Sequence, residues 1–166
     1  MIVSLIAAMA ENRAIGLDAA LPWRLPKDMR HFKELTTAHT VIMGRKTYDT
    51  LPRPLTNRRN VVITRDVSYV ASGADVFHSL QDALRTVSED EEVFVAGGAE
   101  IYRLALPFAD RIYLTMVHTV LEGDTFFPEF EMSDWLLQED TRYDSDGRHI
   151  YSFSFRLYER RSVETE

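Results

Sequence analysis

The sequence has no cysteine, and this absence excludes disulfide bonds, thiolate nucleophiles and cysteine-ligated metal sites. A chain without cysteine also fits a reducing compartment. No apolar run comes close to the roughly 18–20 residues that cross a bilayer. The apolar run over residues 2–10 lacks the basic segment that begins a secretory signal. We therefore expect a soluble cytoplasmic protein with no membrane partner.

The motifs of several enzyme classes are also missing. The chain contains no G-x-S-x-G nucleophile elbow, no H-E-x-x-H pair, no P-loop and no G-x-G-x-x-G fingerprint. The histidines are scattered at spacings that indicate no metal site: His31, His39, His78, His118 and His149. Hydrolytic and metal-dependent activities therefore lose support. A bound redox cofactor fits the sequence, because it brings its own reactivity and needs only to be positioned.

Positive charge is in the minority. Lys and Arg number 19 against 26 Asp and Glu, so the net charge is −7 at pH 7. This acidity argues against non-specific binding to nucleic acid, because phosphate backbones need clustered cations. The 166 residues, 45% of them hydrophobic, suffice for one domain with a real core. We assign residues 1–160 to a single domain and residues 161–166 to a polar tail, and we expect the chain to fray from Arg160 onward.

Short apolar runs without alternation predict strands that are buried on both faces of a sheet. These runs occupy residues 2–9, 41–44, 61–64 and 93–97. Segments with helical periodicity lie between or after them, at residues 26–35, 79–87 and 99–106. Strands that alternate with helices predict a parallel sheet covered on both faces.

The C-terminal part follows a different pattern. Residues 144–147 form a turn signal, and after it Tyr151, Phe153, Phe155 and Leu157 alternate with polar residues. A period of two predicts a strand with one face in water, which closes the sheet as an antiparallel hairpin. The predicted fold class is therefore α/β, with three layers: a mostly parallel central sheet with an antiparallel C-terminal hairpin, and helices on both faces.

Residues 10–25 fit no regular element. Compact domains seldom keep so long a loop unless it is a lid or lines a site. A solvated connector is the alternative. Trp23 and the apolar Ile15, Leu17 and Leu21 favour the lid, because such side chains need something to cover.

One charged residue, Asp28, falls on the face of the 26–35 helix that should be buried. It lies three residues after Leu25 and four before Phe32. Pro26 suits the first helical position, which makes Asp28 the third, where a carboxylate favourably meets the helix dipole. The alternative is an acid at the rim of an apolar pocket that pairs bidentately with a cyclic amidine or a 2-aminopyrimidine edge. Spacing alone leaves both open.

Two glycine-containing segments follow buried strands, Gly44-Arg45-Lys46-Thr47 and Gly97-Gly98. Ligands of open α/β sheets bind at the carboxyl ends of strands, and glycine lets the backbone approach a phosphate closely. The two segments therefore suit a phosphorylated ligand. Taken singly, surface cations explain the first and a tight turn explains the second equally well.

These features occur in an order that resembles the dihydrofolate reductases of the bacterial type, from Met1 to about Arg160. The segments that carry the resemblance are Ile6-Ala7-Ala8, Asn12-Arg13-Ala14-Ile15-Gly16, Leu21-Pro22-Trp23, the helix start from Leu25 to Phe32, Val41 to Thr47, Arg53-Pro54-Leu55, Arg58, Gly97-Gly98 with Ile101-Tyr102, Tyr113-Leu114-Thr115 and Glu122-Gly123-Asp124-Thr125. The Pro-Trp followed by a helical Asp and the Met-Gly-Arg after a strand are especially characteristic.

The resemblance implies an oxidoreductase of one-carbon metabolism that transfers a hydride from NADPH to C6 of 7,8-dihydrofolate, giving tetrahydrofolate. Asp28 resembles the carboxylate that holds the pterin N3 and 2-amino group, with Thr115 as its hydroxyl partner. Arg58 matches the guanidinium that takes the substrate's glutamate carboxylate; taken by itself, it reads as a charge beside a strand. The implied apolar contacts of the substrate are Ile6, Ala7, Met29, Phe32, Leu51 and Leu55.

The same resemblance assigns the cofactor's surroundings. The residues implied in NADPH binding are Ala8, Ile15, Gly16, Gly44, Arg45, Lys46, Thr47, Thr64, Arg65, Gly97, Gly98, Ala99, Ile101, Tyr102 and Thr125. Residues 10–25 resemble the family's mobile lid over the nicotinamide. We expect a water near Trp23 and Leu21 to give N5 its proton, with Asp28 as anchor and electrostatic stabiliser.

Some positions depart from the family pattern. Pro52, Thr56-Asn57 and Tyr48 replace residues common in relatives, at the rim near the glutamate tail or as a mild aromatic change. Glu100 puts a negative charge where some relatives place a cation near the adenosine phosphate. Arg45, Lys46 and Arg65 still offer three positive charges, so we keep NADPH as the expected cofactor.

We expect a monomer that binds antifolate inhibitors and no metal. Two alternatives remain open at this point. One is a reductase of the same fold that acts on another pterin or pyrimidine. The other is a non-catalytic NADP-binding module.

Overall fold

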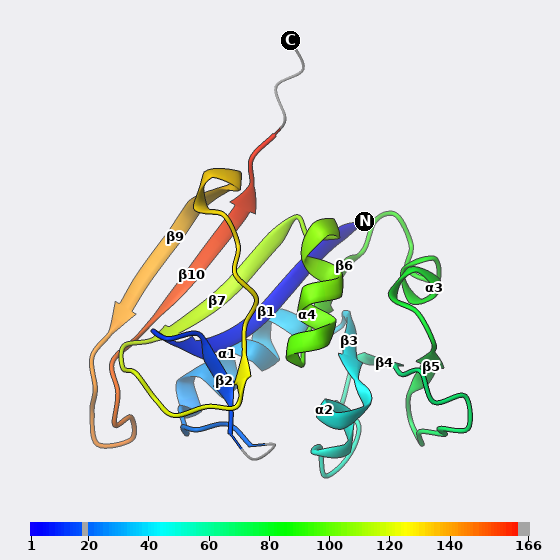
Figure 1. Ribbon diagram of the computed structural model, residues 1–166, viewed down its shortest axis with the longest axis horizontal. Helices are drawn as coiled ribbons and strands as arrows, with labels where there is room; N and C mark the ends of the chain where they lie inside the picture. The colour runs from blue at the N-terminus through cyan, green and yellow to red at the C-terminus, as the bar shows by residue number, and fades with distance from the viewer. Residues whose placement is uncertain (18–19, 163–166) are drawn as a thin grey trace.

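A computed structural model describes residues 1–17 and 20–162. Its main feature is an eight-stranded sheet in the order β5-β4-β3-β6-β1-β7-β10-β9 (Figure 1). The strands of this sheet are β1 Ile2–Ala10, β3 Thr40–Gly44, β4 Arg59–Ile63, β5 Asp75–Phe77, β6 Glu92–Val95, β7 Arg111–Val117, β9 Trp135–Tyr143 and β10 Phe153–Arg160. Neighbours from β5 to β7 are parallel, whereas β10 is antiparallel to both β7 and β9. The predicted mostly parallel sheet with an antiparallel C-terminal hairpin is therefore confirmed.

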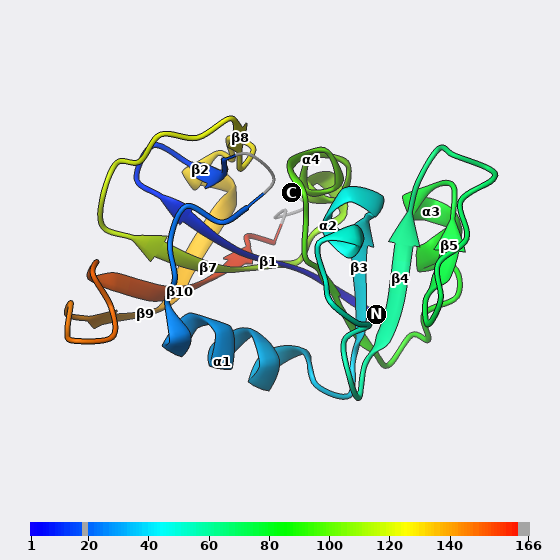
Figure 2. The ribbon, with the colours of Figure 1, turned by 90° about the horizontal axis from the view of Figure 1, so that it is seen from below.

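Helices lie on both faces of this sheet. They are α1 Pro26–Thr36, α2 Arg45–Asp49, α3 Leu80–Leu84 and α4 Ala99–Ala105, with 3₁₀ turns at Leu106–Phe108 and Met132–Asp134. In Figure 2, α1 lies on one side of the sheet and α4 on the other, so the predicted three layers are confirmed. The sequence pattern did not predict α2, and it overextended α3, which ends at Leu84 rather than at residue 87.

The predicted strands are buried because helices cover both faces of the sheet's centre. Leu5, Ile42, Val61 and Val95 are each fully buried, at 0% exposure. Alternate side chains of one strand enter different cores, as Ile6 and Ala7 of β1 do. The sheet therefore separates two apolar layers, and one of them contains the side of β1 that faces α1.

The 10–25 segment contains a short strand, β2 Ala14–Gly16. It pairs in antiparallel fashion with β8, Thr125–Phe126. The contact is close, because a Cβ added to Gly123 would lie 2.7 Å from the Cβ of Ala14. The lid predicted from the sequence is thus tied to the chain that follows β7, although its residues 18 and 19 lie outside the described residues.

The expectation of one wet face on the last strand is wrong. Ser154 is 2% exposed, and its hydroxyl lies 2.7 Å from Nε2 of His118. Tyr158 is 4% exposed and packs in the main core, on the face opposite Phe153. The pairing of β10 with β7 is continuous, so the side chains of β10 still alternate, but residues on both of its faces are buried.

Arg160 does not fray as expected. It ends β10, and its guanidinium donates to the carbonyl oxygens of Ala109 and Leu106, both at 2.7 Å. The same group lies 4.4 Å from the ring centroid of Trp135. The amide of Arg161 donates to Asp134 O at 2.8 Å. Residues 163–166 of the predicted tail lie outside the described residues.

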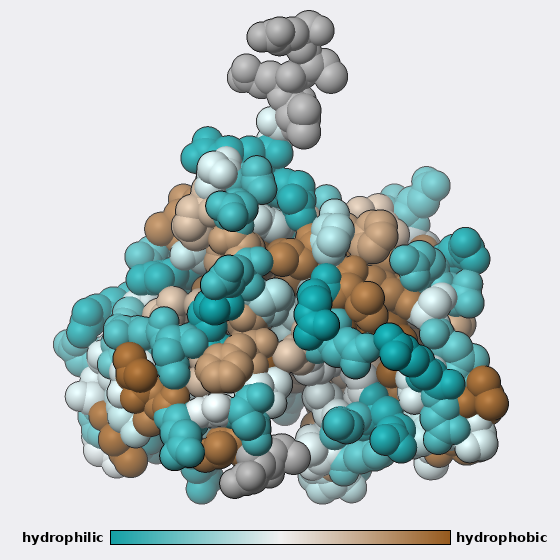
Figure 3. Space-filling view, in the orientation of Figure 1, coloured by the Kyte–Doolittle hydropathy of each residue, from teal (hydrophilic) through white to brown (hydrophobic). Residues whose placement is uncertain are grey.

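Within residues 1–17 and 20–162, we find no helix that is long and apolar enough to span a membrane. Figure 3 shows hydrophilic side chains spread over the face seen in Figure 1, with hydrophobic ones gathered between α4 and α3.

Candidate active site

The carboxyl group of Asp28 points from helix α1 towards the middle of the sheet. Thr115 on β7 donates its hydroxyl hydrogen to Oδ1 of Asp28 across 2.6 Å. Thr115 is 3% exposed and pairs with Ala8 on β1, so the carboxyl is held at a central strand. Asp28 is indeed the third helical residue, but its side chain makes a contact inside the molecule rather than serving only the helix dipole.

The surroundings of Asp28 favour its neutral form. Burial raises the pKa of Asp28 above its usual value, and the hydrogen bond from Thr115 offsets part of that rise. Tyr102 responds to the same environment: burial first, and then the charge of Asp28, raise the pKa of its phenol. A carboxyl group with a raised pKa pairs readily with a ligand that brings N–H donors or a positive charge. Either of these stabilises the charged carboxylate, which burial destabilises.

An apolar wall stands beside this acid. Ile6, Phe32, Leu51 and Leu55 belong to one hydrophobic cluster on the face of the sheet that α1 covers. These four of the six predicted substrate contacts are therefore brought together.

The other two predicted substrate contacts do not join this wall. The side chain of Ala7 faces the opposite core, because neighbouring residues of a strand alternate between the faces. Met29 is 61% exposed, which differs from the expected buried stripe. It lies at the edge of the helix face that carries Leu25 and Phe32, so the sheet does not cover it.

Arg58 is oriented by two hydrogen bonds. Its Nε donates to Thr56 O at 2.9 Å, and its Nη1 donates to the hydroxyl of Thr36 at 3.2 Å. The guanidinium carbon lies 5.9 Å from the ring centroid of Phe32, and partial burial lowers the pKa of Arg58. A fixed planar cation at the end of the apolar wall can receive a carboxylate in bidentate fashion.

Asn60 supports this wall, and the sequence pattern did not identify it. Its side chain is 5% exposed and exchanges two hydrogen bonds with the backbone of Leu55, both at 2.9 Å. The pair fixes the loop that presents Leu55. A single asparagine at the start of an apolar run gave no signal for this role.

The two glycine segments meet at the carboxyl ends of neighbouring parallel strands. The amide of Gly44 donates to Gly97 O at 2.8 Å, which joins the ends of β3 and β6. Gly97 has a φ of +107°, and a Cβ there would lie 3.1 Å from the ring of Tyr102. A Cβ on Gly98 would lie 3.6 Å from Oγ1 of Thr47, and one on Gly44 would lie 3.1 Å from Ile101. Glycine at positions 44 and 97 therefore lets the ends of β3 and β6 pack closely against side chains of α4.

The predicted cations near these segments are not equivalent. Arg65 forms an exposed ion pair with Glu100 at 3.2 Å, so the acid noted in the sequence neutralises one of the three expected charges. Arg45 lies 6.0 Å from the ring centroid of Tyr69, and Lys46 is exposed. Arg45 and Lys46 lie in α2, directly after β3, and Arg65 lies two residues after the end of β4.

Thr64 is engaged within the protein. Its hydroxyl accepts from the amide of Asp66 at 3.1 Å, and Nδ1 of His78 lies 2.8 Å from its carbonyl oxygen. The sequence pattern did not indicate that His78 lies beside Thr64, because the two residues are 14 positions apart.

The residues expected around the nicotinamide lie along β1, β2 and α4. Tyr102 is 5% exposed and donates its hydroxyl hydrogen to Ile6 O at 2.7 Å. Ile15 packs against the main core, and Gly16 pairs with Thr125 across the small sheet. Ala8 is partly buried. Ala99 begins α4 directly after Gly98.

Trp23 and Leu21 differ in their surroundings. Trp23 is 8% exposed, and its indole Nε1 is buried with no hydrogen-bond partner among the described residues. Leu21 is 59% exposed, which differs from the expectation for an apolar lid residue. An antiparallel bridge joins Leu17 and Ala20 just before it.

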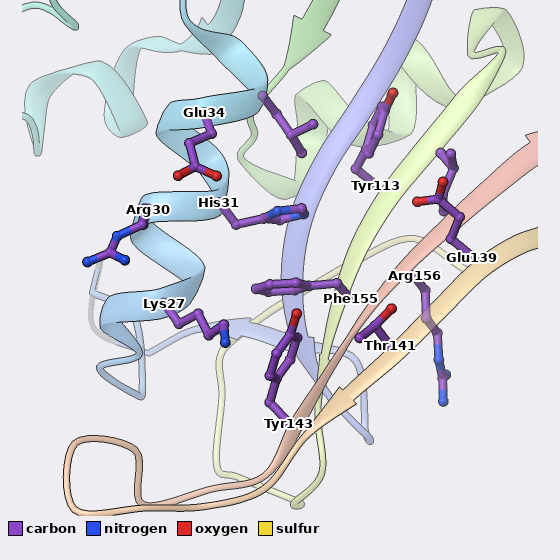
Figure 4. A pocket seen from close by; sticks show the side chains of 12 residues that line it. Lys27, Arg30, His31, Glu34, Tyr113, Glu139, Thr141, Tyr143, Phe155 and Arg156 are labelled. Carbon is purple, nitrogen blue, oxygen red and sulfur yellow. The ribbon is translucent and has the colours of Figure 1, made fainter.

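A cavity of about 430 Å³ lies between α1 and the outer strands β9 and β10 (Figure 4). None of the residues predicted for the substrate or cofactor lines it. Its walls combine Lys27, His31 and Glu34 of the helix with aromatic side chains of the strands, Tyr143 and Phe155 among them. The residues predicted from the sequence, Asp28 and the glycine segments among them, therefore lie outside this cavity.

Comparison with known proteins gives one consistent result. A family model described as dihydrofolate reductase matches residues 2–160. The dihydrofolate reductase of Bacillus subtilis is 44% identical over 160 residues, which is 96% of this chain and 95% of the relative. Dihydrofolate reductase type 3 of Salmonella typhimurium is 43% identical, covering 93% of this chain and 96% of its own. A solved structure of dihydrofolate reductase from Enterococcus faecalis, complexed with NADP(H) and RAB-propyl, has a TM-score of 0.91, 34% identity and 97% coverage of both chains.

Proposed function

The chain belongs to the dihydrofolate reductase family, and we propose that it reduces dihydrofolate with NADPH while the Asp28–Thr115 pair anchors the substrate. In this reaction a hydride is added to C6 of 7,8-dihydrofolate and a proton to N5, giving 5,6,7,8-tetrahydrofolate and NADP⁺. The NADP(H) bound in the Enterococcus faecalis relative supports the choice of cofactor. The reaction needs no metal.

The observation that carries this proposal is the 2.6 Å hydrogen bond from Thr115 to Asp28. It occupies one lone-pair direction of Oδ1 and leaves Oδ2 to accept from the substrate. A 2-aminopyrimidine edge presents two parallel N–H donors, and a carboxyl group matches them in bidentate geometry. The negative charge of Asp28 then stabilises the pterin as positive charge develops at N5.

The apolar wall and Arg58 account for the rest of the substrate. Phe32, Leu51 and Leu55 provide a surface for the pterin and the benzoyl ring. The oriented guanidinium of Arg58 takes the carboxylate of the glutamate tail. With Asp28 at one end of the apolar wall and Arg58 at the other, the substrate binds in a single orientation.

The glycine segments fit a dinucleotide. The amide of Gly44 donates to Gly97 O at 2.8 Å, which brings the two segments together at the carboxyl ends of β3 and β6. Arg45 and Lys46 supply positive charge, and the residues at the start of α4 supply amide donors. When bound, NADPH supplies the hydride from C4 of its nicotinamide. Ala8, Ile15 and Tyr102 orient that ring, and the other predicted residues from Gly16 to Thr125 hold the remainder.

The proton for N5 comes from water. The buried, unpartnered indole N–H of Trp23 suits a group that orients a water molecule near the cleft. Closure of the 10–25 segment excludes bulk solvent and aligns the reacting atoms, with Leu21 at its outer edge.

The direct test is to mix purified protein with NADPH and dihydrofolate and follow the loss of NADPH absorbance. Asp28→Asn keeps the size of the side chain and an acceptor for Thr115 but loses the charge. We expect it to fold normally and to turn over at least about 100-fold more slowly at neutral pH. No loss of absorbance with ample parent protein rejects the activity, and near-normal turnover of the variant rejects the role of Asp28.

A second measurement separates dihydrofolate from other pterins. The parent protein is expected to prefer the glutamate-tailed folate to a tail-less pterin, whereas Arg58→Leu loses that preference. Equal preference in both proteins favours the alternative of a different pterin substrate. Calorimetry that detects NADPH binding without folate binding favours a non-catalytic module.

We place the enzyme in the cytoplasm as a monomer that binds antifolate inhibitors and no nucleic acid. The absence of cysteine fits a reducing compartment, and the net charge of −7 disfavours nucleic acid. Sedimentation of the purified protein tests the monomer.

A further inference from the structure

Helix α1, which carries Asp28, has no capping side chain of its own. Its N-cap residue is Leu25, whose side chain has no oxygen to accept from the first-turn amides. Pro26 has no N–H, and the amide of Met29 donates to Leu25 O at 3.1 Å. The amide of Lys27 therefore depends on a partner outside the helix.

That partner is His149, from the turn between β9 and β10. Its Nε2 accepts the hydrogen of the Lys27 amide at 3.1 Å, across 122 positions of sequence. Its Nδ1 lies 2.9 Å from Oδ1 of Asp146, and the ring is 6% exposed. Because Nε2 must carry a lone pair to accept from an amide, the hydrogen of the neutral ring resides on Nδ1 and is donated to Asp146.

The turn that holds His149 is itself well bonded. Asp146 and His149 exchange two backbone hydrogen bonds, at 2.9 and 3.2 Å. The carboxylate of Asp146 also accepts from the amide of Arg148 at 2.8 Å, and its pKa is lowered chiefly by the bond to His149. The imidazole is thus held at a fixed position by its own turn before it meets α1.

The hairpin also holds the side chain of Lys27. Its Nζ lies 3.6 Å from the ring centroid of Tyr143, and Figure 4 shows the lysine reaching from the helix to that ring. Tyr143 stacks on Phe153 at 5.5 Å, and Phe153 lies 5.2 Å from the ring of His149. Two members of this ring cluster therefore contact Lys27, the residue that precedes Asp28. His149 binds its backbone amide, and Tyr143 contacts its side chain.

We propose that neutral His149 is a positioning residue for Asp28. By accepting from the Lys27 amide, it fixes the first turn of α1 so that the carboxyl of Asp28 stays at Thr115 and meets the pterin. This inference rests on the proposed function. It makes the C-terminal hairpin part of the substrate site, although His149 touches neither substrate nor cofactor.

Three variants separate the acceptor from the rest of the ring. Glutamine at position 149 can place an oxygen near the position of Nε2 and cannot be protonated, whereas asparagine mimics only Nδ1 and leucine mimics neither. We expect His149→Leu and His149→Asn to raise KM for dihydrofolate about fivefold, the effect of one lost hydrogen bond, with kcat and the KM for NADPH changed less than about twofold. His149→Gln is expected to restore KM to the value of the parent protein.

The matched control is His39→Gln. Nδ1 of His39 also lies within hydrogen-bond distance of a backbone group, 3.1 Å from Glu92 O. His39 follows the C-terminal end of α1, however, rather than its N-terminal end. It is expected to leave KM for dihydrofolate unchanged. Equal KM values in all three His149 variants and the parent overturn the proposal, as does a glutamine variant that behaves like leucine.

Amide hydrogen exchange gives a test that needs no activity. In the parent protein the Lys27 amide is expected to be protected by its hydrogen bond to His149. His149→Leu is expected to expose the same amide while the β7 amides stay protected. An unprotected Lys27 amide in the folded parent overturns the proposal, and so does exposure in His149→Leu with no change in KM. Protection by His149 in a protein without reductase activity instead rejects the proposed function.

Discussion

The hydroxyl of Thr115 joins strand β7 to Asp28 of helix α1 across 2.6 Å. This bond places an acid with a raised pKa between a helix N-terminus and the centre of a parallel sheet. Thr115 therefore orients the carboxyl group of Asp28, and its hydrogen bond lowers the pKa of that group.

Replacing Thr115 by valine removes the donor and keeps the shape of the side chain. The hydrogen bond from Thr115 lowers the pKa of Asp28 against the effect of burial, so its loss raises that pKa further. We expect KM for dihydrofolate to rise about tenfold at neutral pH, and the acidic limb of kcat/KM to move to higher pH. Steady-state rates across a pH series measure both changes.

Thr115→Ser is the matched control, because it retains the hydroxyl and loses only a methyl group. It is expected to stay near the parent in both KM and pH profile. A serine variant as impaired as valine shows that packing at Thr115, rather than its hydrogen bond, sets the affinity.

Asp28 makes the free protein less stable at neutral pH. Its pKa is raised in the folded state, so its favourable contribution is complete below the unfolded pKa and is lost as pH rises through the folded pKa. The side chain of Asp28→Asn does not titrate, so the variant does not lose this stabilising contribution as the pH rises. We expect the variant to have a higher free energy of unfolding than the parent at neutral pH, with the difference vanishing towards strongly acidic pH.

Urea unfolding without ligands, repeated over a range of pH, measures this difference. Asp90→Asn, an exposed carboxylate on the surface, is the control and is expected to show no such trend. A parent that is more stable than Asp28→Asn at neutral pH contradicts the cost assigned to the buried acid.

A local signal predicts the start of α3. The N-cap residue Ser79 accepts from the amide of Asp82 at 3.1 Å. Ser79→Ala is expected to lower the free energy of unfolding by about 1 kcal/mol without changing KM for either substrate. Ser79→Asp keeps an acceptor at the cap and is expected to retain the stability in thermal unfolding. A stable alanine variant shows that tertiary contacts of Leu80 and Ala83 hold the helix by themselves.

Features set by neighbouring residues were predictable from the sequence. Continuous apolar runs identified β1, β3, β4 and β6 because those strands are buried on both faces, and the misplaced charge of Asp28 marked the site. The roles of the individual site residues stay a prediction.

Features set by distant partners were not predictable. β2 exists only by pairing with β8, and the register shift before Tyr158 depends on β9. His149 gave no sign of its bond to Lys27, because nothing in the local pattern reports a partner 122 positions away. Arg160 looked like the start of a polar tail, whereas its charge is bonded to the carbonyl oxygens of Leu106 and Ala109.

The ion pair between Arg65 and Glu100 predicts an effect of Glu100 on the KM for NADPH. Both side chains are exposed, so the pair itself contributes little stability, but the acid competes with any phosphate for the arginine. Glu100→Gln frees Arg65 for the 2′-phosphate of NADPH. We expect KM for NADPH to fall about two- to fivefold, KM for NADH to stay the same, and the gain to shrink at high ionic strength. Asp90→Asn removes one negative charge elsewhere and controls for the change in net charge. Equal gains for NADPH and NADH, or the same gain in the control, place the effect in the overall field of the acidic surface rather than at Arg65.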